Sequence, residues 1–205
     1  MRTAGLAITI LALACIGSAQ GQNRFDFSVS GAGVFSKTAS SSSGNITVKP
    51  TKSVAYIGTF RFHFSPKNAV EVNLGHTRNS QIFSIPPDSF RVISAITEYT
   101  GAYVFSPFSS RRFKPFLLAG GGALRFSPGN TYIDTFPASF GADSQTSLAF
   151  LYGGGVDCFV WRKLAVRLQY RGLLYKEPDF HVPSLLFTGA KGHMAEPSVG
   201  IVLKF

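Results

Sequence analysis

The sequence has little charge, little cysteine and no long apolar segment beyond its N-terminus. Asp, Glu, Lys and Arg together make up only 15% of the 205 residues. The two cysteines are Cys15 and Cys158, so a mature chain that has lost Cys15 can form no internal disulfide. Beyond the N-terminal segment, no stretch reaches the roughly 18 continuous apolar residues that a transmembrane helix requires. A chain of this kind can cross a membrane only as strands.

Glycine and phenylalanine are abundant instead, at 21 and 20 residues, and hydrophobic residues make up 45% of the chain. This composition is poor in helix formers and rich in residues that suit strands and turns. The mean hydropathy of +0.16 is high for a soluble domain. Because nothing in the middle of the sequence resembles a long linker, we expect one all-β domain.

The N-terminus has the composition of a signal peptide. Arg2 precedes an apolar run at residues 6–16, and a short run of small residues ends at Ala19. The apolar run is about half as long as a membrane-spanning helix needs. We therefore predict a signal peptide at 1–19 and a mature β-barrel domain at 20–205. Lipidation at Cys15 is disfavoured, because the usual leucine three positions upstream is absent.

Apolar and polar residues alternate through most of the remaining chain. Phe25, Phe27 and Val29 share one parity, while Asp26 and Ser28 share the other. A period of two residues is typical of strands and not of helices. The same alternation predicts eight strands, at 24–35, 54–64, 69–77, 92–105, 113–127, 147–160 and 164–175 and at the C-terminus.

The predicted connections alternate between short and long. The long ones, such as 36–52, 128–146 and 176–194, are rich in Ser, Gly, Pro and Asp. In an outer-membrane barrel the short turns face the periplasm and the long loops face outwards. The loop lengths therefore favour an antiparallel up-and-down transmembrane β-barrel.

Charged residues within the predicted strands lie on the parity opposite the large apolar residues. An outward Lys or Arg at mid-depth in a bilayer costs about 2–4 kcal/mol, whereas the interior of a membrane barrel can be polar. A soluble ligand-binding barrel would show the inverse pattern. Since eight strands enclose a lumen that side chains about fill, we expect the charges to pair across a closed interior. The predicted interior network contains Arg61, Glu71, Glu98, Arg125, Asp157, Arg167 and Arg171.

Aromatic residues gather near the predicted strand ends on the apolar face, where interfacial girdles lie in membrane barrels. The expected girdle contains Phe25, Phe35, Tyr56, Phe64, Tyr103, Phe105, Phe116, Phe126, Phe150, Tyr170 and Phe205.

Two segments resemble a known family. The stretch YGGGVDCFVWRKLAVRLQYRG, residues 152–172, resembles the strand, turn and strand signature of OmpA-type transmembrane domains. The terminal VGIVLKF resembles the signal read by the outer-membrane assembly machinery, with Val199, Ile201, Leu203 and Phe205 at alternating positions. The chain thus resembles the small OmpA/OmpX-like barrels, which implies a location in the outer membrane of a Gram-negative-type cell. No peptidoglycan-binding domain follows Phe205, so the resemblance implies no peptidoglycan anchor.

Signals for catalysis and cofactors are weak. The glycine runs at 120–122 and 153–155 precede no helix and no Lys-Ser/Thr, so we expect them to relieve crowding in a curved barrel and not to bind phosphate. The histidines lack metal-ligand spacing. Glu177, Asp179, His181 and Ser184 share one loop, and a solvated loop explains them as well as a catalytic set does. We expect no catalytic residue, no cofactor and no metal.

The basic balance of the chain, with a net charge of +10, does not predict nucleic-acid binding, because the basic residues are spread over interior, turns and loops. Partners are expected to be outer-membrane lipid, lipopolysaccharide and the assembly machinery, with the chain a monomer. Basic residues at the short turns should face the periplasmic side: Arg111, Arg112, Lys114, Arg162 and Lys163. Loop lysines should meet anionic lipopolysaccharide: Lys37, Lys49, Lys52 and Lys191.

Three functions remain open. The first is a non-enzymatic barrel with a structural or surface-interaction role and a closed polar interior. The second is a small pore or a channel for small or hydrophobic molecules. The third is a lipid-modifying enzyme.

Overall fold

The computed structural model describes residues 24–40, 47–85, 88–108, 110, 112–133, 136–137, 141, 143–180 and 190–205. The predicted signal peptide lies outside these residues. The described strands form a single sheet and are, in chain order, β1 (Phe25–Ser36), β2 (Ala39–Ser40), β3 (Thr47–Pro50), β4 (Ser53–His63), β5 (Asn68–Ile85), β6 (Asp88–Phe105), β7 (Phe113–Ile133), β8 (Phe136–Pro137), β9 (Gln145–Trp161), β10 (Leu164–Lys176) and β11 (Lys191–Lys204).

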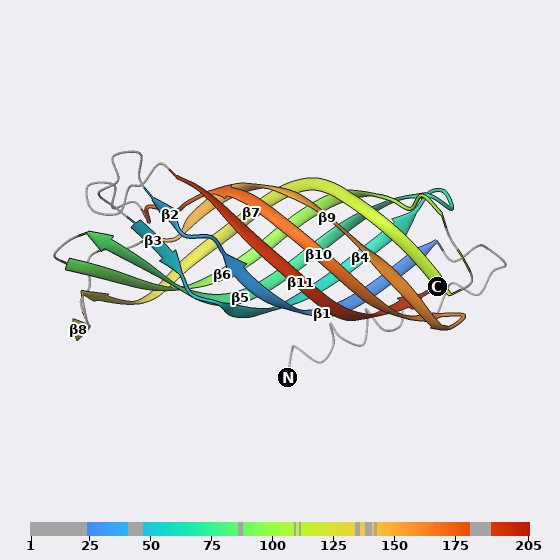
Figure 1. Cartoon of the computed structure of the whole chain (residues 1–205), viewed down its shortest axis with the longest axis horizontal. Helices are drawn as coiled ribbons and strands as arrows, with labels where there is room; N and C mark the ends of the chain where they lie inside the picture. The colour runs from blue at the N-terminus through green and yellow to red at the C-terminus, as the bar shows by residue number, and fades with distance from the viewer. Residues whose placement is uncertain are drawn as a thin grey trace, which may run out of the picture.

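Eight of these strands close into an antiparallel barrel, which confirms the predicted fold (Figure 1). Each barrel strand pairs with its neighbours in the order β1, β4, β5, β6, β7, β9, β10, β11. The last strand then pairs with the first, with Val29 opposite Ile201 and Asp26 opposite Lys204. No sheet edge is left along the barrel wall, so each of the eight barrel strands has a hydrogen-bonding neighbour on both sides.

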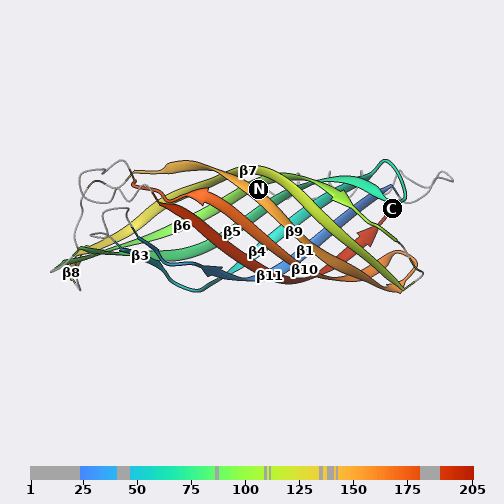
Figure 2. The ribbon, with the colours of Figure 1, turned by 45° about the horizontal axis from the view of Figure 1, so that its top comes forward.

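The two ends of the barrel differ. The turn end holds the connections at 64–67 and 162–163 and the described residues 106–108, 110 and 112 between β6 and β7. The chain also closes the barrel there, because Phe25 and Phe205 exchange backbone hydrogen bonds of 3.1 and 3.0 Å. The opposite end, here named the loop end, holds the short strands β2, β3 and β8 (Figures 1 and 2).

The outer wall is apolar and the inner wall is mixed. On β1, for example, Phe27 and Val29 are exposed, while Asp26, Ser28 and Ser30 are buried in the lumen. This alternation is the predicted one and places large apolar side chains on the outside over most of the barrel. Among the described residues, no helix is long and apolar enough to cross a membrane.

Strand β7 departs from the predicted orientation. Phe116, Leu118, Leu124 and Phe126 are buried in the lumen, and Arg125 points outward. The prediction assumed that large apolar residues always mark the outer face. On β7 the outward positions between Leu117 and Arg125 are instead small residues, and the lumen takes the large ones.

Strands β5 and β6 extend well beyond their predicted loop-side ends. Their ladder continues to the pair Ile85 and Asp88, although the third predicted strand ended at Thr77. The extension was missed because its inward residues include Asn79 and Gln81, so it lacks a simple alternation of apolar and polar residues.

Candidate functional site

Two buried arginines pair with carboxylates on neighbouring strands near the turn end. Arg61 on β4 donates to Glu71 on β5 through Nε at 3.0 Å and Nη2 at 2.8 Å. Arg167 on β10 donates to Asp157 on β9 through Nε at 2.7 Å and Nη2 at 3.0 Å. In both cases the register places the partners directly opposite each other. Arg167 uses both carboxylate oxygens of Asp157, a fork-shaped pairing that fixes the guanidinium plane, whereas both bonds from Arg61 go to Glu71 Oε2.

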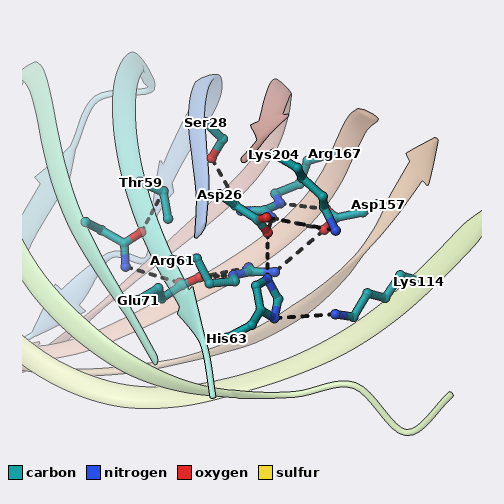
Figure 3. Close-up of polar contacts among 11 residues, drawn as sticks. Asp26, Ser28, Thr59, Arg61, His63, Glu71, Lys114, Asp157, Arg167 and Lys204 are labelled. Atoms are coloured by element: carbon teal, nitrogen blue, oxygen red, sulfur yellow. Dashed lines mark hydrogen bonds and ion pairs between the residues drawn. The ribbon is translucent and has the colours of Figure 1, made fainter. Parts of the chain in front are cut away.

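The two pairs are joined across the lumen. Arg61 Nη1 lies 3.7 Å from Asp157 Oδ2, so one carboxylate contacts both arginines (Figure 3). The Phe116 ring lies against both guanidinium groups, with centroid distances of 4.3 Å to Arg61 and 5.2 Å to Arg167. Because Phe116 on β7 points into the lumen, its ring supplies an aromatic face that two buried cations share.

A second polar group closes the network toward the turn end. His63 Nε2 lies 2.8 Å from Asp26 Oδ2, and Lys114 Nζ lies 3.4 Å from His63 Nδ1. Lys204 approaches Asp26 Oδ1 to 3.9 Å. These four side chains come from β1, β4, β7 and β11, and they point toward one another across the lumen (Figure 3).

Arg171 forms a separate cluster nearer the loop end. Its Nη2 lies 2.5 Å from Glu196 on the adjacent β11 and 2.5 Å from Glu98 on β6, across the lumen. All three residues are almost completely buried. Two carboxylates therefore depend on one guanidinium group for their compensation.

Four buried aromatic side chains form an apolar plug in the lumen near the loop end: Phe83, Phe126, Tyr175 and Phe180. Phe180 makes edge contacts with Phe83 and Phe126, at centroid distances of 6.4 and 6.5 Å. Gln145 holds the segment before it, since its Oε1 accepts hydrogen bonds from the backbone N–H groups of Asp179 and Phe180 at 2.9 and 2.8 Å. The chain thus folds back over the lumen directly after β10.

Glu177 is buried beside this plug, immediately after the last residue of β10. Its backbone N–H donates to the Ala190 carbonyl at 3.1 Å, which ties the two sides of the loop together. Burial raises the pKa of the Glu177 carboxyl to about 7, and the neighbouring Tyr175 opposes this only in part. The carboxyl therefore changes its charge near neutral pH.

We expect Glu177 to make the stability of the barrel pH-dependent. Its pKa rises from an ordinary 4.5 to about 7 on folding, so between these values the folded protein binds more protons than the unfolded chain. Stability therefore falls as pH rises through this window, by up to about 3 kcal/mol, and is constant above it. Urea unfolding in vesicles at pH 5 to 8 should show this slope for the wild type and lose it in Glu177→Gln. The exposed Asp143→Asn serves as control, and parallel curves for all three proteins would contradict the assignment.

A small cavity lies in the lumen beside the Arg171 cluster. This cavity has a volume of about 10 Å³ and is lined in part by Gly75, Glu98, Leu124 and Glu196. That volume holds about one water molecule.

The structure places six of the seven predicted network residues in the lumen. Arg61, Glu71, Asp157 and Arg167 meet near the turn end, and Glu98 meets Arg171 nearer the loop end. Arg125 does not belong to the network, because its side chain is exposed on the outer face of β7. Lipid-exposed cations are disfavoured only within the hydrocarbon region, so an outward arginine near the loop end breaks no physical rule.

Several network residues were missed from the sequence. Asp26, His63 and Lys204 lie on the inward parity of their strands, and this signal could have found them. Glu196 was missed because it lies next to Pro197 and the predicted last strand began after both residues. Lys114 was predicted at a turn facing the periplasm, but it is buried on β7.

Other predicted features are distributed as follows. Val199, Ile201 and Leu203 are exposed on the outer face of β11, and their role as an assembly signal stays a prediction. The girdle prediction was wrong for Phe116 and Phe126, which lie in the lumen. In the loop weighed as a catalytic set, His181 and Ser184 lie outside the described residues. Among the residues that are described, no group of His, Cys, Asp and Glu has the arrangement of a metal site.

The fold and the sequence agree on one family. The model of the outer membrane protein β-barrel domain matches residues 6–205. The chain belongs to this family. Comparison with curated protein sequences gives no match.

Solved structures of small outer-membrane barrels have a similar fold. Neisserial surface protein A matches with a TM-score of 0.54 and 19% identity, over 88% of this chain and 97% of that one. OprG of Pseudomonas aeruginosa matches with 0.52 and 15%, over 92% and 99%. The N-terminal barrel domain of Pseudomonas aeruginosa OprF matches with 0.50 and 12%, over 91% and 100%. At these identities the similarity shows the fold alone.

Proposed function

We propose that this outer-membrane barrel is closed and non-enzymatic, with a role in envelope structure or in surface contacts. The observation that supports this is the content of the lumen. Its turn-end half holds the paired charges around Arg61 and Arg167, and its loop end holds the plug around Phe180. Two chemically different layers would have to move before an ion could pass.

The charged layer is well suited to stay in place. Arg61, Asp157 and Arg167 are each at most 1% exposed and make contacts within hydrogen-bonding or ion-pair distance. Moving any of them would separate buried opposite charges, which is strongly unfavourable in a low-dielectric interior. A rigid interior leaves the loop end and the outer wall as the surfaces through which the protein acts.

Planar-bilayer recordings test the closed lumen. We expect no conductance steps from the refolded protein in concentrated salt, with insertion verified separately by vesicle flotation. The plug variant Phe126→Ala/Phe180→Ala should also stay silent, since the turn-end charges remain in place. Its control is Phe136→Ala, which changes an exposed phenylalanine near the loop end. Stable steps from the wild type would overturn the proposal and favour a small pore.

A further inference from the structure

The outer wall has an open hollow across β7, β9, β10 and β11, near the loop end. Its volume is about 590 Å³, and its lining includes Gly121, Leu148, Phe150, Leu174, Lys176 and Lys191. Gly121 forms the floor because it has no side chain at an outward position, while Leu148, 83% exposed, projects from the wall. The part of the hollow nearer the middle of the barrel is thus apolar and open to the surroundings of the barrel.

The side of the hollow nearer the loop end is cationic. Lys176 and Lys191 are opposite each other in the register of β10 and β11, and both are exposed. The lining residues that the structure describes include these two lysines and no acid. A ligand that fits must therefore have an apolar part toward mid-barrel and an anionic part toward the loop end.

Arg125 adds a second cationic position beside the hollow. It is one outward step beyond Ala123, which pairs with Leu148 of the hollow. In the register, Arg125 pairs with Thr97 on one side and Thr146 on the other, so each neighbouring strand presents a threonine beside Arg125. None of the ion pairs within the described part of the chain involves Arg125.

The geometry points to a binding site for a multiply phosphorylated, acylated glycolipid, the lipid A part of lipopolysaccharide. An acyl chain lies over Gly121 between Leu148, Phe150 and Leu174. One phosphate contacts Lys176 and Lys191, and a second contacts Arg125, with Thr97 and Thr146 as hydrogen-bonding groups. This site rests on the outer-membrane location of the proposed function and on the outward orientation that the long connections at the loop end predict.

The separation of the cations favours this lipid over a common phospholipid. Lys191 and Arg125 lie on β11 and β7, with β9 and β10 between them. A single phosphate contacts one of these positions, whereas a disaccharide that carries a phosphate at each end spans both. The threonine hydroxyls provide further partners for phosphate or sugar oxygens.

Titration of the refolded chain in detergent micelles with fluorescent lipid A tests the site. Bisphosphorylated lipid A should bind at least about tenfold more tightly than the same lipid without phosphates, and than phosphatidylglycerol. The variant Arg125→Gln/Lys191→Gln should weaken binding of the bisphosphorylated lipid by about tenfold or more. The matched control Arg162→Gln/Lys163→Gln removes the same charge from an exposed arginine and an exposed lysine in the turn between β9 and β10, at the opposite end of the barrel, and should leave the affinity unchanged.

Each contrary result overturns the site. If the dephosphorylated lipid binds equally well, the proposed contacts between phosphates and cations are wrong, and this comparison requires no variant. Equal binding of phosphatidylglycerol removes the preference for a glycolipid. If the two double variants lose affinity equally, the effect comes from net charge and not from this site. Because the titration reports on the outer wall and bilayer recordings report on the lumen, either proposal can fail while the other stands.

Discussion

Replacement of Arg171 by methionine is expected to lower the free energy of unfolding in lipid vesicles by about 3–5 kcal/mol. Arg171 is the cationic partner of both Glu98 and Glu196, and its Nη2 lies 2.5 Å from each of them. Without the guanidinium, two buried carboxylates would face each other with no compensating charge. Methionine retains much of the side-chain volume, so the loss reports on charge and hydrogen bonding and not on a large cavity.

Urea titration in vesicles, followed by tryptophan fluorescence of Trp161 and by heat-modifiable gel migration, measures this change. The triple variant Arg171→Met/Glu98→Gln/Glu196→Gln should recover a large part of the loss, since it removes the uncompensated charge. Replacing the exposed Arg91 by methionine is the control. A loss below about 1 kcal/mol for Arg171→Met would lie within the range of exposed ion pairs. It would show that the Arg171 cluster contributes little to stability.

The barrel itself could be predicted from the sequence because a period of two residues fixes which side chains share a face. On β10, Arg167, Gln169 and Arg171 alternate with outward Leu168 and Tyr170, and the structure has this arrangement. Parity alone does not say which face is outside, and this step failed on β7. There the outward positions between Leu117 and Arg125 hold small residues, which leave the wall hollowed at Gly121, and the inward ones include Phe116 and Phe126.

The chemistry of the lumen could be predicted only in part. Cross-strand pairs such as Arg61 with Glu71 follow once the register is known, because the partners are direct neighbours. Contacts across the lumen, such as Arg171 with Glu98, depend on barrel closure and were not predictable from spacing. The plug depends on Phe180, which follows β10 in the left-handed backbone region with φ of 52°. Such a conformation leaves no periodic signal in a sequence.

The largest backbone effect is expected at Gly122, where we predict that substitution by alanine lowers stability by about 3 kcal/mol or more, or prevents refolding. Gly122 pairs with Thr100 on β6. A Cβ atom added at Gly122 would collide with the Tyr99 carbonyl oxygen and would lie 2.7 Å from the Thr100 Cα. These contacts are with backbone atoms, so no side-chain rotation relieves them, and β6 and β7 would have to separate at the centre of their ladder.

The neighbouring Gly121 provides the matched control, because it lies on the same strand with its missing side chain directed outward. A Cβ atom there would approach the Ala149 carbonyl oxygen to 3.0 Å, a tight contact that a small shift relieves. Gly121→Ala should therefore refold, with a stability change of about 1 kcal/mol or less. Replacing glycine by alanine lowers the conformational entropy of the unfolded chain equally in both variants. The difference in stability between them therefore isolates the close approach of β6 and β7. Equal stability of the two variants would show that the glycines at 120–122 are not required for this approach, and that the curvature of the wall has another origin.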